Sequence, residues 1–326
     1  MPNWSLIDSL NAAHFSESTS YQAVHIDKRE NDMSPLKIAV LGNCQARPIA
    51  ALFGNNNSSH SISYIGIVHL LKDCDKVELF QALDDADLII TQNIADNYPC
   101  EFVRTSMLMS RYPNKIMRIA NLYFRGYNPE LRYIRNGKLG TLRGPLGDYH
   151  ISTILQTWLE GGSIQQIHDR LQDKQWNSTE YGDIASTSLA QLYARDADLD
   201  IPAAALIAKD WRNQHLFFTF NHPSMQLLTR YCTAIAAQFS LDIGDLSINQ
   251  TSEPLGQFQL PRNPMLMTAQ TPDGDSVYTG VEVTSIDEWT VSTGKKSVWS
   301  EELLVEAFIS IYEANSNFFS ESSKAA

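Results

Sequence analysis

The stretch that decides the fold is KIAVLGNCQARPIA, residues 37–50. Its first five residues form a short apolar, β-favouring run that ends at Gly42, a pattern typical of a central strand of a parallel sheet. A helical pattern follows in PIAALF, and Pro48 fits best at the first helical position. We therefore expect a strand, then a helix from about residue 48, with Cys44 in the turn between them.

Strand and helix patterns alternate beyond this unit, which is typical of βαβ units around a parallel sheet. The further expected strands are 61–68, 86–94 and 115–122, and the expected helices are 76–83 and 101–111. We therefore expect an α/β core over residues 36–125, built on a parallel sheet.

The rest of the chain has a different character. Residues 1–35 are polar and acidic, and we expect a flexible extension that lacks the apolar stretch of a signal peptide. Residues 126–326 predict a mostly helical part. Its expected elements are helices at 149–160, 163–174, 186–196, 203–214, 225–239 and 301–315, a strand at 216–220 and an irregular segment at 249–280.

Composition limits the classes of function. The chain has 326 residues, with 37 acidic against 25 basic side chains and a formal charge of −12. Nucleic acid requires a dense basic surface, so we expect no nucleic-acid partner. No stretch reaches the ~20 apolar residues of a membrane span, and the four scattered cysteines lack the spacing of a zinc site or a disulfide framework. We expect a cytoplasmic protein with reduced thiols and no metal; the oligomeric state stays open.

Cys44 is the sharpest candidate for chemistry. A turn at the carboxyl edge of a parallel sheet is where α/β folds place ligands. The helix N-terminus favours an anion there and lowers the pKa of a thiol, and Arg47 adds positive charge. The same backbone amides suit an oxyanion hole. The alternative is a buried structural cysteine.

Two histidines are candidate bases. His222, in FNHPS, follows a strand pattern and precedes a helix, so it occupies the same kind of loop as Cys44. His150 lies in GPLGDYHIS, where Asp148 is a candidate helix cap. Asn93, at the end of a predicted strand, is a candidate amide for an oxyanion, with Gln92 and Gln45 as similar candidates. For each of these residues a structural role is the alternative.

A basic loop precedes His150. Its cations are Arg125, Arg132, Arg135, Lys138 and Arg143. Arginine binds phosphate bidentately, so the loop is either a phosphate clamp or a solvated connector. No GxGxxG, Walker A or GxSxG motif is present, which argues against nicotinamide, P-loop and standard α/β-hydrolase chemistry.

The string GNCQ, residues 42–45, resembles the opening of the WcbI-type polysaccharide biosynthesis family, where it follows the first strand. GDYHIS and FNHPS are also similar to segments of that family, and the order of elements is similar over residues 37–240. The family's core is similar to the SGNH hydrolase arrangement, with Cys44 standing where those enzymes place a serine. The DxxH motif that SGNH enzymes usually carry near the C-terminus is not found here, so the carboxylate partner of the base stays unnamed.

The resemblance implies an O-acyltransferase that moves an acetyl group from coenzyme A to a sugar hydroxyl of a capsule polysaccharide. It implies Cys44 as the nucleophile, His222 or His150 as the base, and Asn93 beside the oxyanion. The donor, acetyl-CoA, is expected to bind near the residues Asn43, Gln45, Arg47, Arg125 and Arg143. Two alternatives stay open: a non-catalytic nucleotide- or saccharide-binding module, and an SGNH-like esterase.

Overall fold

The structure is a computed structural model, and it describes residues 35–54, 59–239, 241, 243, 252–263, 265–266 and 277–322. The expected N-terminal extension lies outside these ranges apart from Pro35, as does part of the expected irregular segment. The expected α/β core lies within them, except for residues 55–58.

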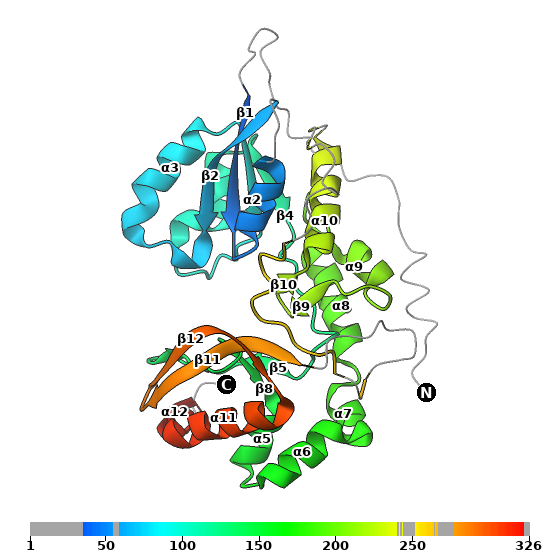
Figure 1. Cartoon of the computed structure of the whole chain (residues 1–326). Coiled ribbons are helices and arrows are strands. Elements are labelled where there is room, and N and C mark those ends of the chain that lie inside the picture. The colour runs from blue at the N-terminus through cyan, green and yellow to red at the C-terminus, as the bar shows by residue number, and fades with distance from the viewer. Residues whose placement is uncertain are drawn as a thin grey trace.

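A four-stranded parallel sheet in the order β2-β1-β3-β4 confirms the predicted α/β core (Figure 1). Its elements are β1 (Leu36–Gly42), α2 (Ala46–Gly54), β2 (His60–Ile67), α3 (Lys76–Asp85), β3 (Leu88–Gln92), α4 (Thr105–Arg111) and β4 (Ile116–Ile119). Helix α2 begins two residues before the predicted start. Pro48 is tolerated in its first turn because the backbone N–H groups there have no intrahelical partner.

Both faces of the sheet are covered, as the apolar run of β1 predicts. Successive side chains of a strand point to opposite faces. Ile38 and Val40 therefore join the core that contains α2 and α10, whereas Ala39 and Leu41 join the core that contains α3 and α4. This packing holds β1 in place between two layers of helices, and the strand ends at Gly42 on the carboxyl edge of the sheet.

The remaining elements form the lower part of the molecule in Figure 1 and the helices beside the sheet. The helices are α5 (Ser152–Leu159), α6 (Ile164–Gln172), α7 (Lys174–Tyr181), α8 (Ile184–Asp196), α9 (Ala204–Asp210), α10 (Met225–Gln238), α11 (Glu301–Ala314) and α12 (Ser316–Ser322). The strands are β5 (Leu131–Tyr133), β6 (Arg135–Asn136), β7 (Gly140–Thr141), β8 (Tyr149–Ile151), β9 (Phe217–Thr219), β10 (His222–Pro223), β11 (Tyr278–Asp287) and β12 (Thr290–Trp299).

Two local predictions in this part are wrong. Residues 149–151 were expected to start a helix, but they form β8, which pairs antiparallel with β5. The long β11–β12 hairpin was not predicted at all, and it packs on α11 (Figure 1). The carboxyl edge of the parallel sheet, where β1 ends, faces this hairpin (Figure 1).

Candidate functional site

The GNCQ turn, residues 42–45, is held by side-chain amides. Asn43 Oδ1 accepts from the backbone N–H of Gln45 at 2.9 Å, and Asn43 Nδ2 donates to Asn121 Oδ1 at 2.9 Å. The backbone N–H of Asn43 donates to Gln92 Oε1 at 2.8 Å. A Cβ at Gly42 would lie 2.7 Å from that same Gln92 oxygen, so only glycine fits there. The turn therefore has one fixed shape, and it presents Cys44 beyond the sheet edge.

Gln45 connects this turn to the rest of the site. Its side chain is fully buried, and Oε1 accepts from Gln92 Nε2 at 2.8 Å and from the Leu122 N–H at 3.1 Å. Nε2 donates to the carbonyl oxygens of Leu122 at 2.7 Å and Asn221 at 2.9 Å. Asn221 directly precedes His222. The loops that carry Cys44 and His222 are thus joined by a hydrogen bond between the residues next to them.

Cys44 is a half-buried free thiol. Burial raises its pKa, and this effect outweighs the backbone N–H groups of Cys44 and Gln45, which lower it. The expectation that the helix N-terminus would bring the pKa below its usual value is therefore wrong, because removal from water dominates. A negative charge on Cys44 would raise the pKa of Tyr149, which places the two side chains near each other. The thiol is mostly protonated at neutral pH and needs a base to ionise.

His222 lies on β10, directly after the two-residue turn of the β9–β10 hairpin. Its Nε2 is 3.3 Å from the Tyr149 hydroxyl, and its Nδ1 is buried without a hydrogen-bond partner among the described residues. Burial lowers its pKa to about 4. The imidazole is therefore neutral at neutral pH, which is the form that accepts a proton.

Tyr149 was missed by the sequence reasoning, which singled out its neighbour instead. Its hydroxyl donates to Asn221 Oδ1 and accepts from Thr219 Oγ1 at 3.1 Å. Its ring packs edge-on against Phe220, with 5.1 Å between the ring centroids. Burial raises the pKa of this hydroxyl well above its ordinary value, so Tyr149 stays protonated. Had residues 149–151 been identified as a strand, its alternation would have shown Tyr149 and His150 facing opposite ways.

His150 lies elsewhere, in the core under the β11–β12 hairpin. It is fully buried, with Nδ1 at 2.9 Å from the Tyr312 hydroxyl and Nε2 at 3.0 Å from the Leu142 carbonyl oxygen. Asn93 is exposed beyond β3, and within the described ranges no hydrogen bond joins it to the GNCQ turn. The structure therefore joins the loop of His222 to the GNCQ turn, whereas His150 and Asn93 make no such connection among the described residues.

The cations of the basic loop have different surroundings. The guanidinium of Arg125 is used inside the protein, since Nη2 donates to the carbonyl oxygens of Pro129 at 2.7 Å and Leu131 at 3.3 Å. Arg135 lies over the Tyr133 ring, 4.6 Å from its centroid. Arg143 is exposed, with its Nε 3.6 Å from Asp148 Oδ1.

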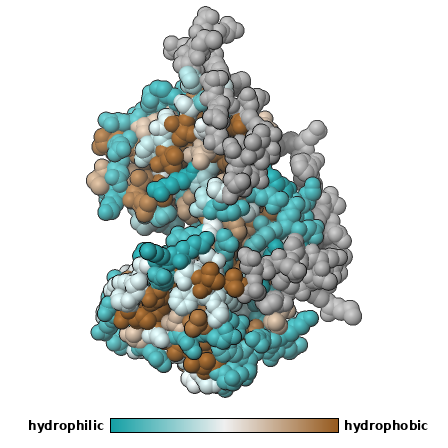
Figure 2. Space-filling model, in the orientation of Figure 1, coloured by the Kyte–Doolittle hydropathy of each residue, from teal (hydrophilic) through white to brown (hydrophobic). Residues whose placement is uncertain are grey.

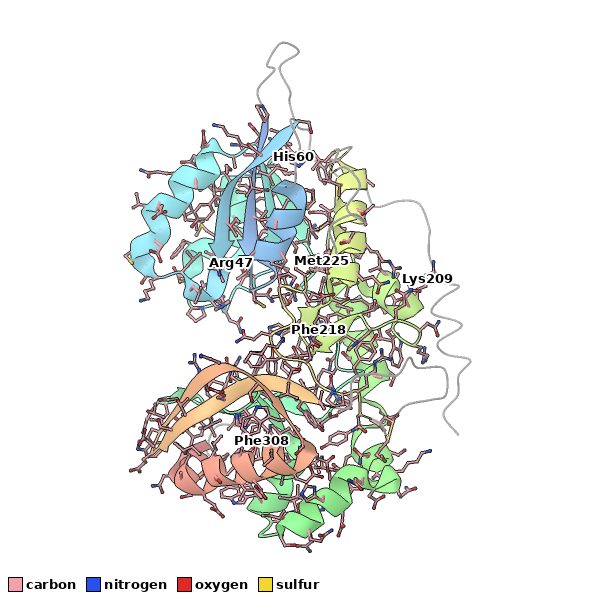
Figure 3. All side chains as sticks on the ribbon, in the orientation of Figure 1. Arg47, His60, Lys209, Phe218, Met225 and Phe308 are labelled. Carbon is pink, nitrogen blue, oxygen red and sulfur yellow. The ribbon has the colours of Figure 1, made fainter. Side chains whose placement is uncertain are left out.

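Four polar side chains near the GNCQ turn form a group that we call the rim: Arg47, His69, Asp148 and Arg143. Arg47 lies at the lower end of the sheet, on the side that faces the hairpin (Figure 3). His69 follows β2, whose last residue pairs with Gly42 of β1, so it lies next to the GNCQ turn. Desolvation and the charge of Arg47 lower the pKa of His69, while Asp148 raises it. Arg47 and Asp148 therefore lie within electrostatic reach of His69, and Asp148 lies 3.6 Å from Arg143. Figure 2 shows a notch between the upper and lower parts of the molecule.

The described part of the chain contains neither a candidate metal site nor a candidate membrane-spanning helix. Across the ranges that the structure describes, no three His, Cys, Asp or Glu side chains are grouped to hold a metal ion. In the same ranges, no helix has both the length and the apolar character to cross a bilayer.

The fold and the site define a class: an α/β protein with a cysteine turn and a neutral histidine joined at the carboxyl edge of its sheet. The family model described as "Polysaccharide biosynthesis enzyme WcbI" matches residues 37–242, and the chain belongs to this family of enzymes of polysaccharide biosynthesis.

The solved structure of a WcbI protein, a polysaccharide biosynthesis enzyme, has a similar fold. The TM-score is 0.70 at 17% sequence identity, and the similarity covers 88% of this chain and 93% of that one. That structure is described as the native protein without a disulfide bond between coenzyme A and one of its cysteines. No curated protein sequence gives a significant match.

Proposed function

We propose that this WcbI-family enzyme is an O-acyltransferase that moves an acetyl group from coenzyme A to a sugar hydroxyl of a capsule polysaccharide, through a thioester on Cys44. The observation that carries the proposal is the hydrogen bond from Gln45 Nε2 to the Asn221 carbonyl oxygen. It joins the loop of a nucleophilic residue to the loop of a neutral base, and proton transfer requires such proximity.

The chemistry follows from the two protonation states. Neutral His222 takes the proton of the Cys44 thiol, and Sγ attacks the acyl carbon of the donor. The bond from the acyl carbon to the coenzyme A sulfur breaks, and the coenzyme A thiolate takes the proton back from the imidazole. A sugar hydroxyl then gives its proton to His222 and attacks the acyl-Cys44 carbon, and Cys44 leaves as a thiolate and recovers that proton.

The turn supplies a group for the oxyanion. The backbone N–H groups of Cys44 and Gln45 both lower the thiol pKa, but the Gln45 N–H already donates to Asn43 Oδ1, so the Cys44 N–H is the candidate donor. Such an amide also stabilises a negative oxygen on a carbon bound to Sγ. Asn43, Gln45 and Arg125 then contribute by shaping the site, because their side chains are engaged within the protein.

The donor's phosphates belong at the charged rim. Coenzyme A carries a pyrophosphate and a 3′-phosphate, and the chain's charge of −12 opposes them unless cations lie nearby. Arg47 and Arg143 are such cations in the rim, and His69 beside Arg47 is a neutral hydrogen-bonding group because its pKa is lowered. Coenzyme A as donor is also supported by the similar WcbI structure, which is described as lacking a disulfide bond between coenzyme A and one of its cysteines. A cytoplasmic location is part of the proposal, since the four cysteines are free thiols.

Calorimetric titration with coenzyme A tests the donor. Saturable binding that weakens as salt is raised is expected, because phosphate contacts are screened. No heat of binding at millimolar ligand would contradict the proposal. Binding without any acetyl transfer would identify the non-catalytic binding module, and release of free acetate in place of sugar ester would identify the esterase.

A further inference from the structure

His222 has no carboxylate partner among the described residues. A catalytic histidine is commonly oriented by an Asp or Glu that accepts a hydrogen bond from one ring nitrogen. Here burial alone accounts for the lowered pKa of His222, so no nearby carboxylate raises it. The hydrogen-bonding group beside the ring is the Tyr149 hydroxyl, 3.3 Å from Nε2.

The proton of Tyr149 is already assigned by its other contacts. Its hydroxyl lies 2.5 Å from Asn221 Oδ1 and donates to it. Thr219 Oγ1 lies 3.1 Å from the Tyr149 oxygen and 3.2 Å from Asn221 Oδ1, and because the Tyr149 hydroxyl makes the shorter contact with Asn221 Oδ1, the Thr219 proton goes to the Tyr149 oxygen. Asn221 cannot reverse this arrangement, because its Nδ2 donates to the Tyr133 hydroxyl at 3.2 Å, which fixes Oδ1 on the Tyr149 side. A hydroxyl has one proton and two lone pairs. The remaining contact of the Tyr149 oxygen is therefore to accept a hydrogen bond from Nε2–H of His222.

This assignment determines which ring nitrogen is the base. With the proton on Nε2, the lone pair of the neutral imidazole is on Nδ1. Nδ1 is the buried atom that has no hydrogen-bond partner. An unpaired buried acceptor is unfavourable, and such atoms in native structures call for an explanation. A role in accepting a proton during the reaction provides one.

We propose that Tyr149 is the positioning residue of the site: its hydroxyl takes the place of the missing carboxylate, holds His222 as the Nε2–H tautomer and leaves Nδ1 to exchange protons with Cys44. The inference rests on the proposed function. The step balances within the groups named, since the Sγ–H bond breaks as the Nδ1–H bond forms, and the departing coenzyme A thiolate then takes that proton.

A phenol in this position has a chemical consequence. A carboxylate stabilises the imidazolium form by its charge, whereas the neutral Tyr149 hydroxyl does not. His222 therefore holds a proton only briefly and passes it on readily. This suits a reaction that begins and ends with a thiol, because sulfur-to-sulfur acyl exchange leaves a basic thiolate to collect the proton.

The test combines a spectroscopic and a kinetic measurement. Nitrogen-15 NMR of histidine-labelled wild-type protein should show His222 as the Nε2–H tautomer at neutral pH. Tyr149→Phe, which keeps the ring packing on Phe220, should mix the two tautomers and slow acetylation of Cys44 by acetyl-CoA about 10- to 100-fold. Tyr312→Phe is the matched control: it also removes a tyrosine hydroxyl beside a buried histidine, but that hydroxyl lies 2.9 Å from Nδ1 of His150 and not beside His222. It should change the rate less than about threefold and keep the tautomer.

The outcomes separate this inference from the proposed function. A wild-type spectrum with the proton on Nδ1 would overturn the positioning role without any variant, so a Tyr149→Phe protein that failed to fold would not leave it undecided. Equal rates and identical tautomers in the two tyrosine variants would also overturn it. If wild-type protein is never acetylated, the proposed function fails, while the tautomer in the wild-type spectrum still decides whether Tyr149 orients His222.

Discussion

His222 and His150 form an instructive pair, because burial lowers the pKa of each to about 4 and yet they differ in every contact. Both ring nitrogens of His150 form hydrogen bonds in the protein interior, one with the Tyr312 hydroxyl and one with the Leu142 carbonyl oxygen. His222 has one nitrogen bonded to Tyr149 and the other buried and unpaired. The comparison shows that a lowered pKa identifies both histidines as buried, whereas their hydrogen bonds distinguish them: the described contacts hold His150 at both ring nitrogens and His222 at one.

The different positions follow from strand geometry. Tyr149 and His150 are consecutive in β8, so their side chains leave the strand on opposite faces. Tyr149 points to the β9–β10 hairpin and His222, while His150 packs against Phe308 with 5.1 Å between ring centroids. The alternation of β8 therefore places Tyr149 beside His222 and places His150 in the core with Phe308.

The largest effect is expected from His222→Ala. Loss of a general base typically slows a reaction 10²- to 10⁴-fold, so the rate of Cys44 acetylation should fall by about that factor. Thermal unfolding followed by circular dichroism should show a folded protein, because the side-chain hydrogen bond that the variant loses is the single 3.3 Å contact of Nε2 with Tyr149. Acetylation at the wild-type rate would remove His222 from the mechanism.

His150→Ala should have the opposite profile. It leaves the Tyr312 hydroxyl and the Leu142 carbonyl oxygen unpaired and opens a cavity beside Phe308, so the free energy of unfolding should fall by about 3 kcal/mol. Urea unfolding measures this loss. Acetylation per folded molecule should stay within about twofold of the wild type, since His150 touches no reacting group. A stable variant with little acetylation would reverse the roles of the two histidines.

Glu130 extends the comparison to a buried acid. Burial raises its pKa to about 7, above the ordinary 4.5, so the folded state binds more protons than the unfolded state between these values. Its contribution to stability is present below pH 4.5 and is lost as the pH rises to 7. His222 and His150 act oppositely, because their folded pKa values of about 4 lie below 6.5 and add stability as the pH rises through that window.

Glu130→Gln isolates the effect of this acid. The amide keeps an acceptor for Asn263 Nδ2, which lies 3.2 Å from Glu130 Oε2, but it does not ionise. Between pH 5 and pH 8 the variant should gain about 2 kcal/mol relative to the wild type. Urea unfolding at the two pH values gives the difference. If the free energy of unfolding changed equally in the two proteins between pH 5 and pH 8, ionisation of Glu130 would not destabilise the folded state.

The smallest effect is expected at the rim. Arg143 is exposed and already lies near Asp148, so its loss should weaken coenzyme A binding only about fivefold, or ~1 kcal/mol. Arg111→Ala is the matched control, because Arg111 forms a comparable exposed pair with Asp84 on the sheet's outer helices. Calorimetry at low salt compares the two variants. Equal affinities would show that Arg143 is a solvated connector residue.

The parallel sheet and the GNCQ turn were predictable because their signals are local. Apolar runs that end at glycine identify central strands, and Pro48 limits where the next helix begins. The β8 strand was not predictable in this way, since its three residues acquire their conformation by pairing with β5, which lies earlier in the chain. The β11–β12 hairpin carries many Thr, Ser and Lys side chains, and only the alternation of Val281 and Val283 indicates a strand.

The loops of the candidate site were predictable from the sequence, and the side chains that join them were not. Cys44 and His222 each follow a strand and precede a helix, a context that a single sequence displays. The partners of Gln45 lie 77 and 176 positions away, and no sequence pattern reveals that this amide joins the two loops. Asn93 was chosen for its place after β3, but Gln92, one residue earlier, is the side chain that reaches the turn.

Mass spectrometry of the intact protein after incubation with acetyl-CoA is the decisive experiment for a thioester on Cys44. We predict that wild-type protein gains the mass of one acetyl group, that peptide mapping places it on Cys44, and that Cys44→Ala gains none. Exposed Cys74 serves as an internal control for non-specific acetylation, and it should remain unmodified. An unmodified wild-type protein, or acetylation of Cys74 and Cys44 alike, would contradict a thioester formed by the Cys44–His222 site.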